Sequence, residues 1–135
     1  MRDGTVWLRN QQSADGSWGA TATAYNQYRV GLTSLAVLAM INCDVPLDAE
    51  PVQRGLKFLR SRSPREPEFV YEASLYVMAL CAAGPQKQDM ARIGRMTRRI
   101  IATQCTAKDS GPSRGLWGYR LADSGGDPGL SLIHI

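Results

Sequence analysis

Apolar residues along the chain form two kinds of stretch that alternate. Residues 30–41, VGLTSLAVLAMI, and 70–81, VYEASLYVMALC, are apolar nearly all round, which is typical of helices buried on most sides. Residues 48–61 and 86–104 instead place apolar residues on one stripe and Arg or Lys on another, as amphipathic helices do. The pattern predicts an all-α protein in which polar and buried helices alternate, with no sheet.

Signals for helix ends set the bounds of five elements. Asp48 precedes Glu50 and Pro51, so we expect it to cap the third helix. Gly84-Pro85 is a stop signal and ends the fourth. The predicted helices are residues 2–12, 27–42, 48–61, 68–83 and 86–104.

Two short patterns recur along the sequence. DGTVWLRNQQ at 3–12 returns as RGLKFLRSRS at 54–63 and, eroded, as RMTRRIIATQ at 95–104. Gly-x-Trp-Gly at 16–19 returns at 115–118, which is 99 residues later, or two repeats. The apolar helices also align with each other at an offset of 40 residues. Such repetition predicts stacked helical hairpins.

The recurring turn has a structural explanation. Gln12 supplies both a donor and an acceptor, and Trp18 supplies a flat apolar ring with one indole N–H. Gly16 permits the positive φ of a tight turn. We therefore expect Gln12 with Trp18, and Gln104 with Trp117, to join neighbouring hairpins rather than to contact a ligand. The residues assigned to this structural pattern are Trp7, Gln12, Gly16, Trp18, Gly55, Phe58, Gln104, Gly115 and Trp117.

These residues resemble a known family. Trp7-Leu8-x-x-x-Gln12 followed by Gly16-x-Trp18, and Arg54-Gly55-x-x-Phe58-Leu59, look like the QW repeat of the terpenoid cyclase and protein prenyltransferase superfamily, with a finer similarity to bacterial squalene-cyclase-like repeat proteins. The resemblance implies an α/α toroid of alternating inner and outer helices. This chain would supply a partial, open arc of about two and a half hairpins.

The resemblance covers residues 1–127, which we expect to be one partial repeat domain. The ending LSLIHI resembles a translated sequencing adapter, so we expect residues 128–135 to be a non-native or truncated tail. We therefore expect the chain to be a fragment of a longer protein. The inner helices of such an arc should lose part of their cover.

Composition excludes several classes of protein. A net charge of +4 could suggest nucleic acid, but the basic residues are spread among Asp and Glu on helix faces, which favours a solvated surface. The cysteines, Cys43, Cys81 and Cys105, have no paired spacing, so we expect buried structural thiols rather than a metal site. No apolar run reaches the roughly 20 residues of a membrane span, and MRDGTVWLRN lacks the apolar core of a signal peptide. The sequence assigns no localisation.

The catalytic sets known in this superfamily are not found in the sequence. It contains no Asp-x-Asp-Asp cluster, no Asp, Cys and His set for zinc, and no Gly-Cys-Gly-Glu-Gln thioester. We therefore expect no cofactor or metal, and an inactive fragment even where the whole protein is an enzyme.

The resemblance places candidate site residues at the N-terminal ends of the inner helices, which ring the cavity of a toroid. Tyr28, Arg29, Tyr71 and Tyr76 are candidates for binding, although the tyrosines are also ordinary core residues. Glu72 and Asp127 are weak catalytic candidates. Glu72 interrupts an apolar helix, which fits either a carboxylate at a positive helix end, paired with an arginine, or one that binds a cation or moves a proton.

Two function classes remain open from the sequence. One is a cyclase- or prenyltransferase-like protein acting on isoprenoid chains, with an anionic head at the helix N-termini near Arg29. The other is a non-catalytic helical-repeat module that binds a lipid or a protein partner. A TPR-like solenoid is disfavoured, because the repeat spacings differ from its fixed 34-residue period.

Overall fold

The computed structural model describes residues 2–19, 27–105 and 114–121, and within these ranges the protein is all-α. The helices are α1 (Arg2–Asn10), α2 (Arg29–Asn42), α3 (Glu50–Arg60), α4 (Val70–Ala82) and α5 (Lys87–Ala102). All five begin and end within a few residues of the predicted bounds. The described residues form no strand, only two isolated bridges, Phe69 with Arg120 and Gln104 with Trp117.

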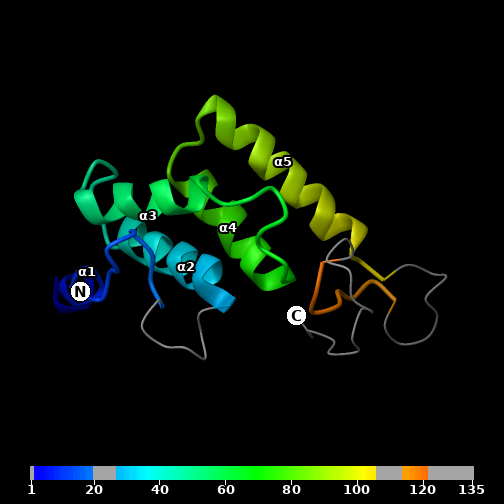
Figure 1. Cartoon of the computed structure of the whole chain (residues 1–135), viewed down its shortest axis with the longest axis horizontal. Coiled ribbons are helices and arrows are strands. Elements are labelled where there is room, and N and C mark those ends of the chain that lie inside the picture. The colour runs from blue at the N-terminus through cyan, green and yellow to red at the C-terminus, as the bar shows by residue number, and fades with distance from the viewer. Residues whose placement is uncertain (1, 20–26, 106–113, 122–135) are drawn as a thin grey trace.

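The helices form hairpins around two central helices. α2 and α4 lie side by side and run in the same direction, while α3 packs on α2 and α5 packs on α4, each antiparallel to its neighbour (Figure 1). α1 lies at one end of this row, next to α2. The helical-hairpin arrangement predicted from the repeats is therefore confirmed. No helix in the described ranges combines the length and apolar content needed to cross a membrane.

Burial follows the expected pattern with one exception. Eight of the fourteen residues of α2 are buried, whereas only two of the sixteen residues of α5 are. α3 was expected to be an exposed outer helix, yet six of its eleven residues are buried. The reason is that α3 is covered twice, by α2 and by the turn at residues 12–18.

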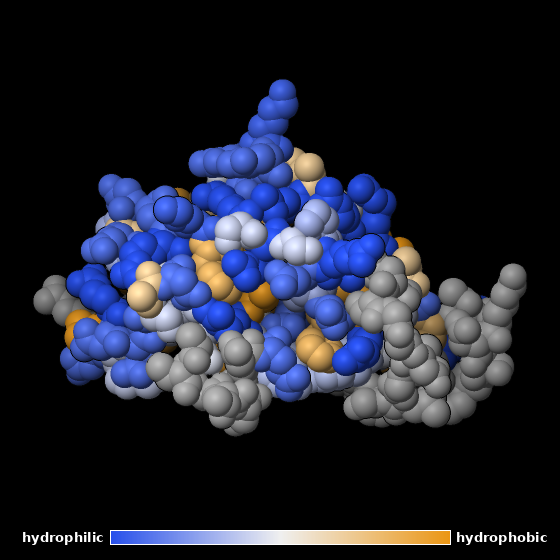
Figure 2. Space-filling view, in the orientation of Figure 1, coloured by the Kyte–Doolittle hydropathy of each residue, from blue (hydrophilic) through white to orange (hydrophobic). Residues whose placement is uncertain are grey.

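The two central helices, α2 and α4, also leave apolar side chains exposed. Leu35 on α2 is 52% exposed and Met78 on α4 is 55% exposed. Charged and polar side chains cover most of the face in Figure 2, with apolar side chains in small areas between them.

Of the two predicted helix ends, one is confirmed and one is wrong. Gly84 follows α4 with a φ of 72°, and its N–H donates to the Cys81 carbonyl at 3.2 Å. Asp48, however, does not cap α3, because the N-cap is Ala49 and no side chain bonds there. Pro51 in the first turn has no N–H, which removes one of the donors that a cap would satisfy.

A buried ion pair joins α3 to α5. Arg60 donates from Nε to Asp89 Oδ1 at 3.0 Å and from Nη2 to Oδ2 at 2.8 Å, and the Asp89 side chain is completely buried. Asp89 Oδ2 also accepts the Gln86 N–H at 2.9 Å, at the start of α5. Burial alone would raise the pKa of Asp89, but these hydrogen bonds and the charge of Arg60 outweigh it and lower that pKa.

The prediction of buried cysteines is wrong. Cys81 is exposed, and Cys43 and Cys105 are only partly buried. Cys81 lies on the same uncovered side of α4 as Met78, three residues earlier, because no described helix packs there.

Candidate functional site

The first Gln–Trp turn, residues 12–18, follows α1 and is tied to it by the tryptophan. The Trp18 indole N–H donates to the Leu8 carbonyl at 2.8 Å, and the Trp18 side chain is 5% exposed. The backbone N–H of Trp18 donates to Thr33 Oγ1 on α2 at 3.0 Å. Gly16 has a φ of 88°, the turn geometry expected from the sequence.

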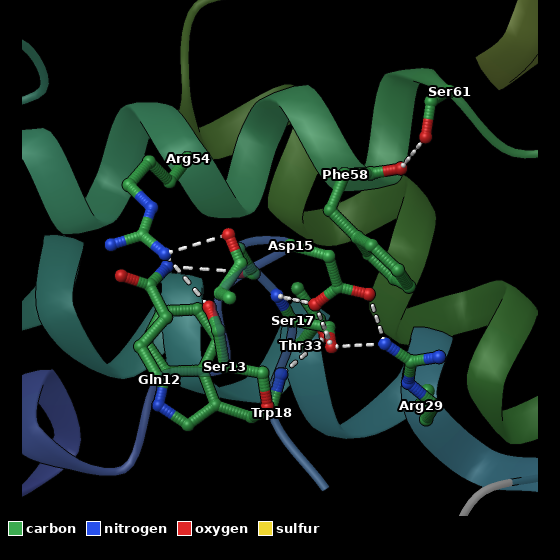
Figure 3. Close-up of polar contacts among 12 residues, drawn as sticks. Gln12, Ser13, Asp15, Ser17, Trp18, Arg29, Thr33, Arg54, Phe58 and Ser61 are labelled. Atoms are coloured by element: carbon green, nitrogen blue, oxygen red, sulfur yellow. Dashed lines mark hydrogen bonds and ion pairs between the residues drawn. The ribbon is translucent and has the colours of Figure 1, made fainter. Parts of the chain in front are cut away.

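This turn is also bound to α3. Gln12 Nε2 donates to two carbonyls, that of Gly16 at 3.0 Å and that of Pro51 at 2.9 Å. A Cβ at Gly16 would overlap the Arg54 carbonyl, and a Cβ at Gly55 would lie 3.1 Å from the Trp18 ring. Figure 3 shows Arg54 and Phe58 pointing from α3 toward the turn. The turn therefore links α1, α2 and α3.

The second Gln–Trp turn, Gln104 with residues 115–117, repeats the same bonds. The Trp117 indole N–H donates to the Ile100 carbonyl at 2.8 Å, and Ile100 precedes Gln104 by four residues, as Leu8 precedes Gln12. Gln104 Nε2 donates to the Gly115 carbonyl at 2.9 Å. Gly115 has a φ of 84°, close to that of Gly16.

Trp7 belongs to the repeated structural pattern, but its side chain is not buried. Its side chain is 61% exposed, whereas Phe58, its counterpart in the repeat, is 4% exposed. The difference follows from position, because α1 lies at the end of the row of helices and packs mainly on α2.

A cavity of about 410 Å³ lies where α2 and α4 begin. We call it the arginine-lined cavity. Its walls come from the starts of the two inner helices, the C-terminal end of α3, the 62–69 segment and Arg120. It is lined by Gln27, Arg29, Val30, Phe58, Arg62, Glu66, Pro67, Glu68, Phe69, Glu72 and Arg120.

Two of the arginines share one aromatic ring. The Arg29 and Arg62 guanidinium carbons lie 5.2 and 4.2 Å from the centroid of the Phe58 ring. Such contacts hold a guanidinium in place. Arg62 also donates from Nε to the Phe58 carbonyl at 3.3 Å and from Nη2 to Ser61 Oγ at 3.0 Å, and its Nη1 lies 3.9 Å from Glu66 Oε2. Arg120 stacks in the same way on Phe69, at 5.5 Å.

Arg29 is also tied to the first Gln–Trp turn. It forms an ion pair with Asp15, and its Nη2 donates to Ser17 Oγ at 2.6 Å (Figure 3). Burial acts to raise the pKa of Asp15, but the hydrogen bonds from Ser17 and Arg29 lower it overall. Arg29 Nε is buried and has no hydrogen-bond partner among the described residues. The turn thus fixes one wall of the cavity.

Glu72 is the buried carboxyl of this cavity. Its side chain is 2% exposed, and Oε1 accepts the Gly31 N–H at 2.8 Å, in the first turn of α2. Burial raises the pKa of Glu72 to about 7; the Gly31 hydrogen bond acts to lower it, and the charges of Glu68 and Glu66 add to the rise.

The sequence analysis expected Glu72 to stabilise the positive end of a helix. The carboxyl of Glu72 does bond at the start of a helix, but the helix is α2, whereas Glu72 belongs to α4. Tyr28, the N-cap of α2, makes no side-chain cap, and the carboxyl of α4 serves instead. The arginine partner expected for Glu72 is not found among the ion pairs of the described residues. A Cβ at position 31 would lie 2.8 Å from Glu72 Cγ, so this approach requires glycine. The sequence analysis did not identify this partnership.

The candidate tyrosines separate into two groups. Tyr28 and Tyr71 belong to an aromatic cluster with Phe69 and Tyr119, with centroids 5.1 to 6.3 Å apart. Phe69 forms the boundary between this cluster and the cavity. Burial and hydrogen bonding to Tyr119 raise the pKa of Tyr71.

Tyr76 lies elsewhere. It is 2% exposed, in the core near Arg92, and does not line the cavity. Asp127 lies outside the described residues, as does the tail at 128–135. The structure thus brings Arg29 and Glu72 together in one cavity and places Tyr28 and Tyr71 beside it.

Arg62, Phe69 and Arg120 line the cavity but were missed. Arg62 follows the predicted third helix, which ends at residue 61, and was given no role, and Arg120 follows the second Gly-x-Trp pattern without any signal of its own. The sequence feature that could have pointed to these arginines is Phe58, a buried aromatic residue next to an Arg-rich helix end.

Three or more metal-ligating side chains do not gather anywhere in residues 2–19, 27–105 and 114–121. Comparison with protein-family models, with curated proteins and with solved structures gave no match.

Proposed function

We propose that the chain is a segment of a terpenoid cyclase- or prenyltransferase-like helical-hairpin protein, and that the arginine-lined cavity binds the anionic head of a ligand with an apolar, isoprenoid-type tail. The observation that carries the proposal is the position of the cavity. It lies where two parallel inner helices begin, and three arginines line it. Helix N-termini and guanidinium groups both favour an anion.

The charge balance of the lining supports an anionic head. Arg29, Arg62 and Arg120 face Glu66, Glu68 and Glu72. With a pKa of about 7, Glu72 takes up a proton at little cost near neutral pH, which removes one negative charge from the lining and gives Glu72 an O–H donor. A diphosphate or carboxylate accepts such bonds.

The tail of the ligand needs an apolar surface close to the cavity. Leu35 and Met78 are exposed on the two helices whose N-termini line the cavity. The aromatic cluster of Tyr28, Phe69, Tyr71 and Tyr119 adjoins the cavity, because Phe69 belongs to both. An amphiphile bound with its head among the arginines could extend along these side chains.

Catalysis by Glu72 is not part of this proposal. Protonation of an alkene requires a strong acid, and a carboxyl with a pKa near 7 is a weaker acid than an ordinary glutamate. Glu72 is suited to moving a proton to or from an ionisable head. Cyclisation chemistry would need an acid supplied from beyond the described residues.

Calorimetric titration with farnesyl diphosphate, and with farnesol as the ligand without a head, tests the proposal. We expect the chain to bind the diphosphate and to bind farnesol more weakly. Losing a charge-assisted bond costs about 1.5–3 kcal/mol, so Arg29→Ala and Arg62→Ala should each weaken binding by roughly ten-fold or more. Glu72→Gln should remove the pH dependence of binding.

Arg98→Ala is the matched control, because Arg98 is an exposed arginine of α5 that does not line the cavity. Equal affinities for the two ligands would contradict the proposed head site, as would unchanged binding in Arg29→Ala and Arg62→Ala. Complete lack of binding by the unmodified chain would favour the second candidate.

That second candidate is a non-catalytic module that binds a protein partner. The observation that favours it is the exposure of Leu35 and Met78 on the inner helices, since uncovered apolar side chains are typical of protein contacts. This second candidate function does not involve the three arginines that line the cavity.

A further inference from the structure

The outer face of α5 carries basic side chains with no acidic side chain among them. The helix contains five basic residues and one acidic residue, Asp89, which is completely buried and paired with Arg60 of α3. Lys87, Arg95 and Arg98 are exposed, and none of them forms an ion pair within the described part of the chain. The mixture of acidic and basic residues expected from the sequence therefore does not extend to this face.

The exposed side chains of α5 form two parallel rows. Lys87 and Arg98 are eleven residues apart, and so are Met90 and Ile101. Eleven residues are close to three turns of an α-helix, so the members of each pair lie in line along the surface. Met90 is 57% exposed and Ile101 is 62% exposed. The face thus has a basic row and, beside it, an apolar row.

Gly94 lies between the two rows, near the middle of the helix. Apart from the backbone of α5 itself, a Cβ at this position would have only Arg98 Nη1, at 3.5 Å, within 4 Å among the described residues. Since glycine has no side chain, another backbone can approach α5 closely at this point.

The exposed face of α3 provides a comparison. On α3, Arg54 Nη1 lies 3.9 Å from Glu50 Oε1, one turn earlier, and Gln53 and Lys57 are also exposed. No large apolar residue of α3 is exposed. The face of α3 is thus an ordinary solvated surface of mixed charge, and the face of α5 differs from it in both respects.

We propose that this face of α5 is a docking surface for an acidic amphipathic helix of a partner protein. The carboxylates of the partner lie against Lys87, Arg95 and Arg98, since their charges are complementary. Its apolar residues lie against Met90 and Ile101. No residue of α5 lines the arginine-lined cavity, so this surface does not depend on the ligand proposed there.

Two other anionic partners fit the surface less well. A nucleic acid would contact the basic row through its phosphates, but it would leave Met90 and Ile101 without an apolar partner. A helix that lies on a membrane typically inserts Trp, Phe or Leu side chains, and α5 contains none of these. An acidic helix contacts both rows.

The probe is a synthetic helical peptide of about 20 residues, with glutamate along one stripe and leucine along the next. Its control has the same composition in an order that removes the stripes. Fluorescence anisotropy of the labelled peptides measures binding to the whole chain. We expect saturable binding of the striped peptide, about ten-fold weaker binding of the control, and weaker binding of both as the salt concentration rises.

Matched variants test each row of the surface. Arg95→Glu combined with Arg98→Glu should weaken binding about ten-fold or more, because it places like charges against the peptide. Met90→Ser combined with Ile101→Ser should also weaken it. Lys57→Glu, at an exposed lysine of α3, is the control and should change binding little. All of these side chains are exposed, so the variants should fold, which circular dichroism checks.

The two proposed sites respond to different variants. Arg98→Ala should weaken binding of the peptide but not of farnesyl diphosphate. Arg29→Ala, in the arginine-lined cavity, should weaken binding of farnesyl diphosphate but not of the peptide. Failure of either proposal therefore leaves the other standing.

Four results would overturn the docking surface. One is no saturable binding of the striped peptide up to about 1 mM. A second is equal binding of the striped and control peptides, which would mean charge attraction alone. A third is unchanged binding in the two double variants. The fourth is tighter binding to phosphatidylserine vesicles or to a DNA duplex than to the striped peptide, which would identify a different partner.

Discussion

The Trp18 indole N–H donates to the Leu8 carbonyl at 2.8 Å, and it does so from the far side of a tight turn. This bond ties the last turn of α1 to a ring that lies in the core against α3 and α2. The pair Trp117 and Ile100 repeats it at the same distance. One bond thus recurs at two hairpin junctions that are almost 100 residues apart in sequence.

Trp18→Ala should lower the free energy of unfolding by roughly 3–5 kcal/mol, the range for truncating a large buried aromatic side chain. Trp117→Ala should cost less, because Trp117 is only partly buried. Trp7→Ala is the control: its side chain is 61% exposed, so its effect should stay within about 0.5 kcal/mol. Denaturant unfolding measures all three, and equal effects for Trp18 and Trp7 would contradict the account.

Gln12→Ala should destabilise the protein by roughly 1–3 kcal/mol, because it removes the side-chain hydrogen bonds to the Gly16 and Pro51 carbonyls. Gln104→Ala removes one bond at a more exposed site and should cost less. The same unfolding experiment ranks the two variants. A larger loss for Gln104 than for Gln12 would show that the two-carbonyl contact is unimportant.

Gly31→Ala should destabilise the protein by roughly 1–3 kcal/mol, since the new Cβ would lie 2.8 Å from Glu72 Cγ inside a packed region. Gly94→Ala, in α5, meets only the end of the Arg98 side chain at 3.5 Å and should be neutral or stabilising. Adding Glu72→Ala to Gly31→Ala should recover part of the loss. Equal stabilities of Gly31→Ala and Gly94→Ala would contradict the close approach of Gly31 to Glu72.

Stability should fall as pH rises from about 4.5 to 7. In this window Glu72 ionises in the unfolded chain but stays protonated in the fold, where its pKa is about 7, so the folded state binds the extra proton. The full penalty, reached above pH 7, is roughly 3 kcal/mol. Asp15 and Asp89 have lowered pKa values, so their contributions change only below this window.

Unfolding measured at pH 5 and pH 8 tests this dependence, with Glu72→Gln as the comparison. The amide does not titrate, so the variant should lose most of the difference between the two pH values. The prediction fails if wild type and Glu72→Gln show the same pH profile.

The sequence predicted what depends on local pattern and repetition. The five helices follow from apolar periodicity, and the structural role of the turn that contains Gln12 and Trp18 follows from its recurrence at Gln104 and Trp117. The cavity could be predicted only in part, because its walls come from segments that periodicity cannot bring together. Arg62 and Arg120 reach it from the end of α3 and from beyond α5, and each looks like a surface arginine in sequence.

The predictions from sequence failed where contacts between distant parts of the chain, or their absence, determined the environment of a residue. Asp48 looked like a cap, but Pro51 reduced the need for one. Glu72 was recognised as unusual, yet its partner is a backbone N–H at Gly31, 41 residues away, which no side-chain pattern reports. Cys81 was placed inside because α4 is apolar all round, whereas the described helices cover only part of α4.

The central claim, that an anionic head binds beside Glu72, is tested most directly by NMR titration of the Glu72 side-chain carboxyl carbon with and without farnesyl diphosphate. The account predicts a pKa near 7 without the ligand. It predicts a higher pKa when the ligand is bound, because a neighbouring anion disfavours the carboxylate. Farnesol should leave that pKa unchanged. A pKa near the ordinary value of glutamate, or no response to farnesyl diphosphate, would contradict the account.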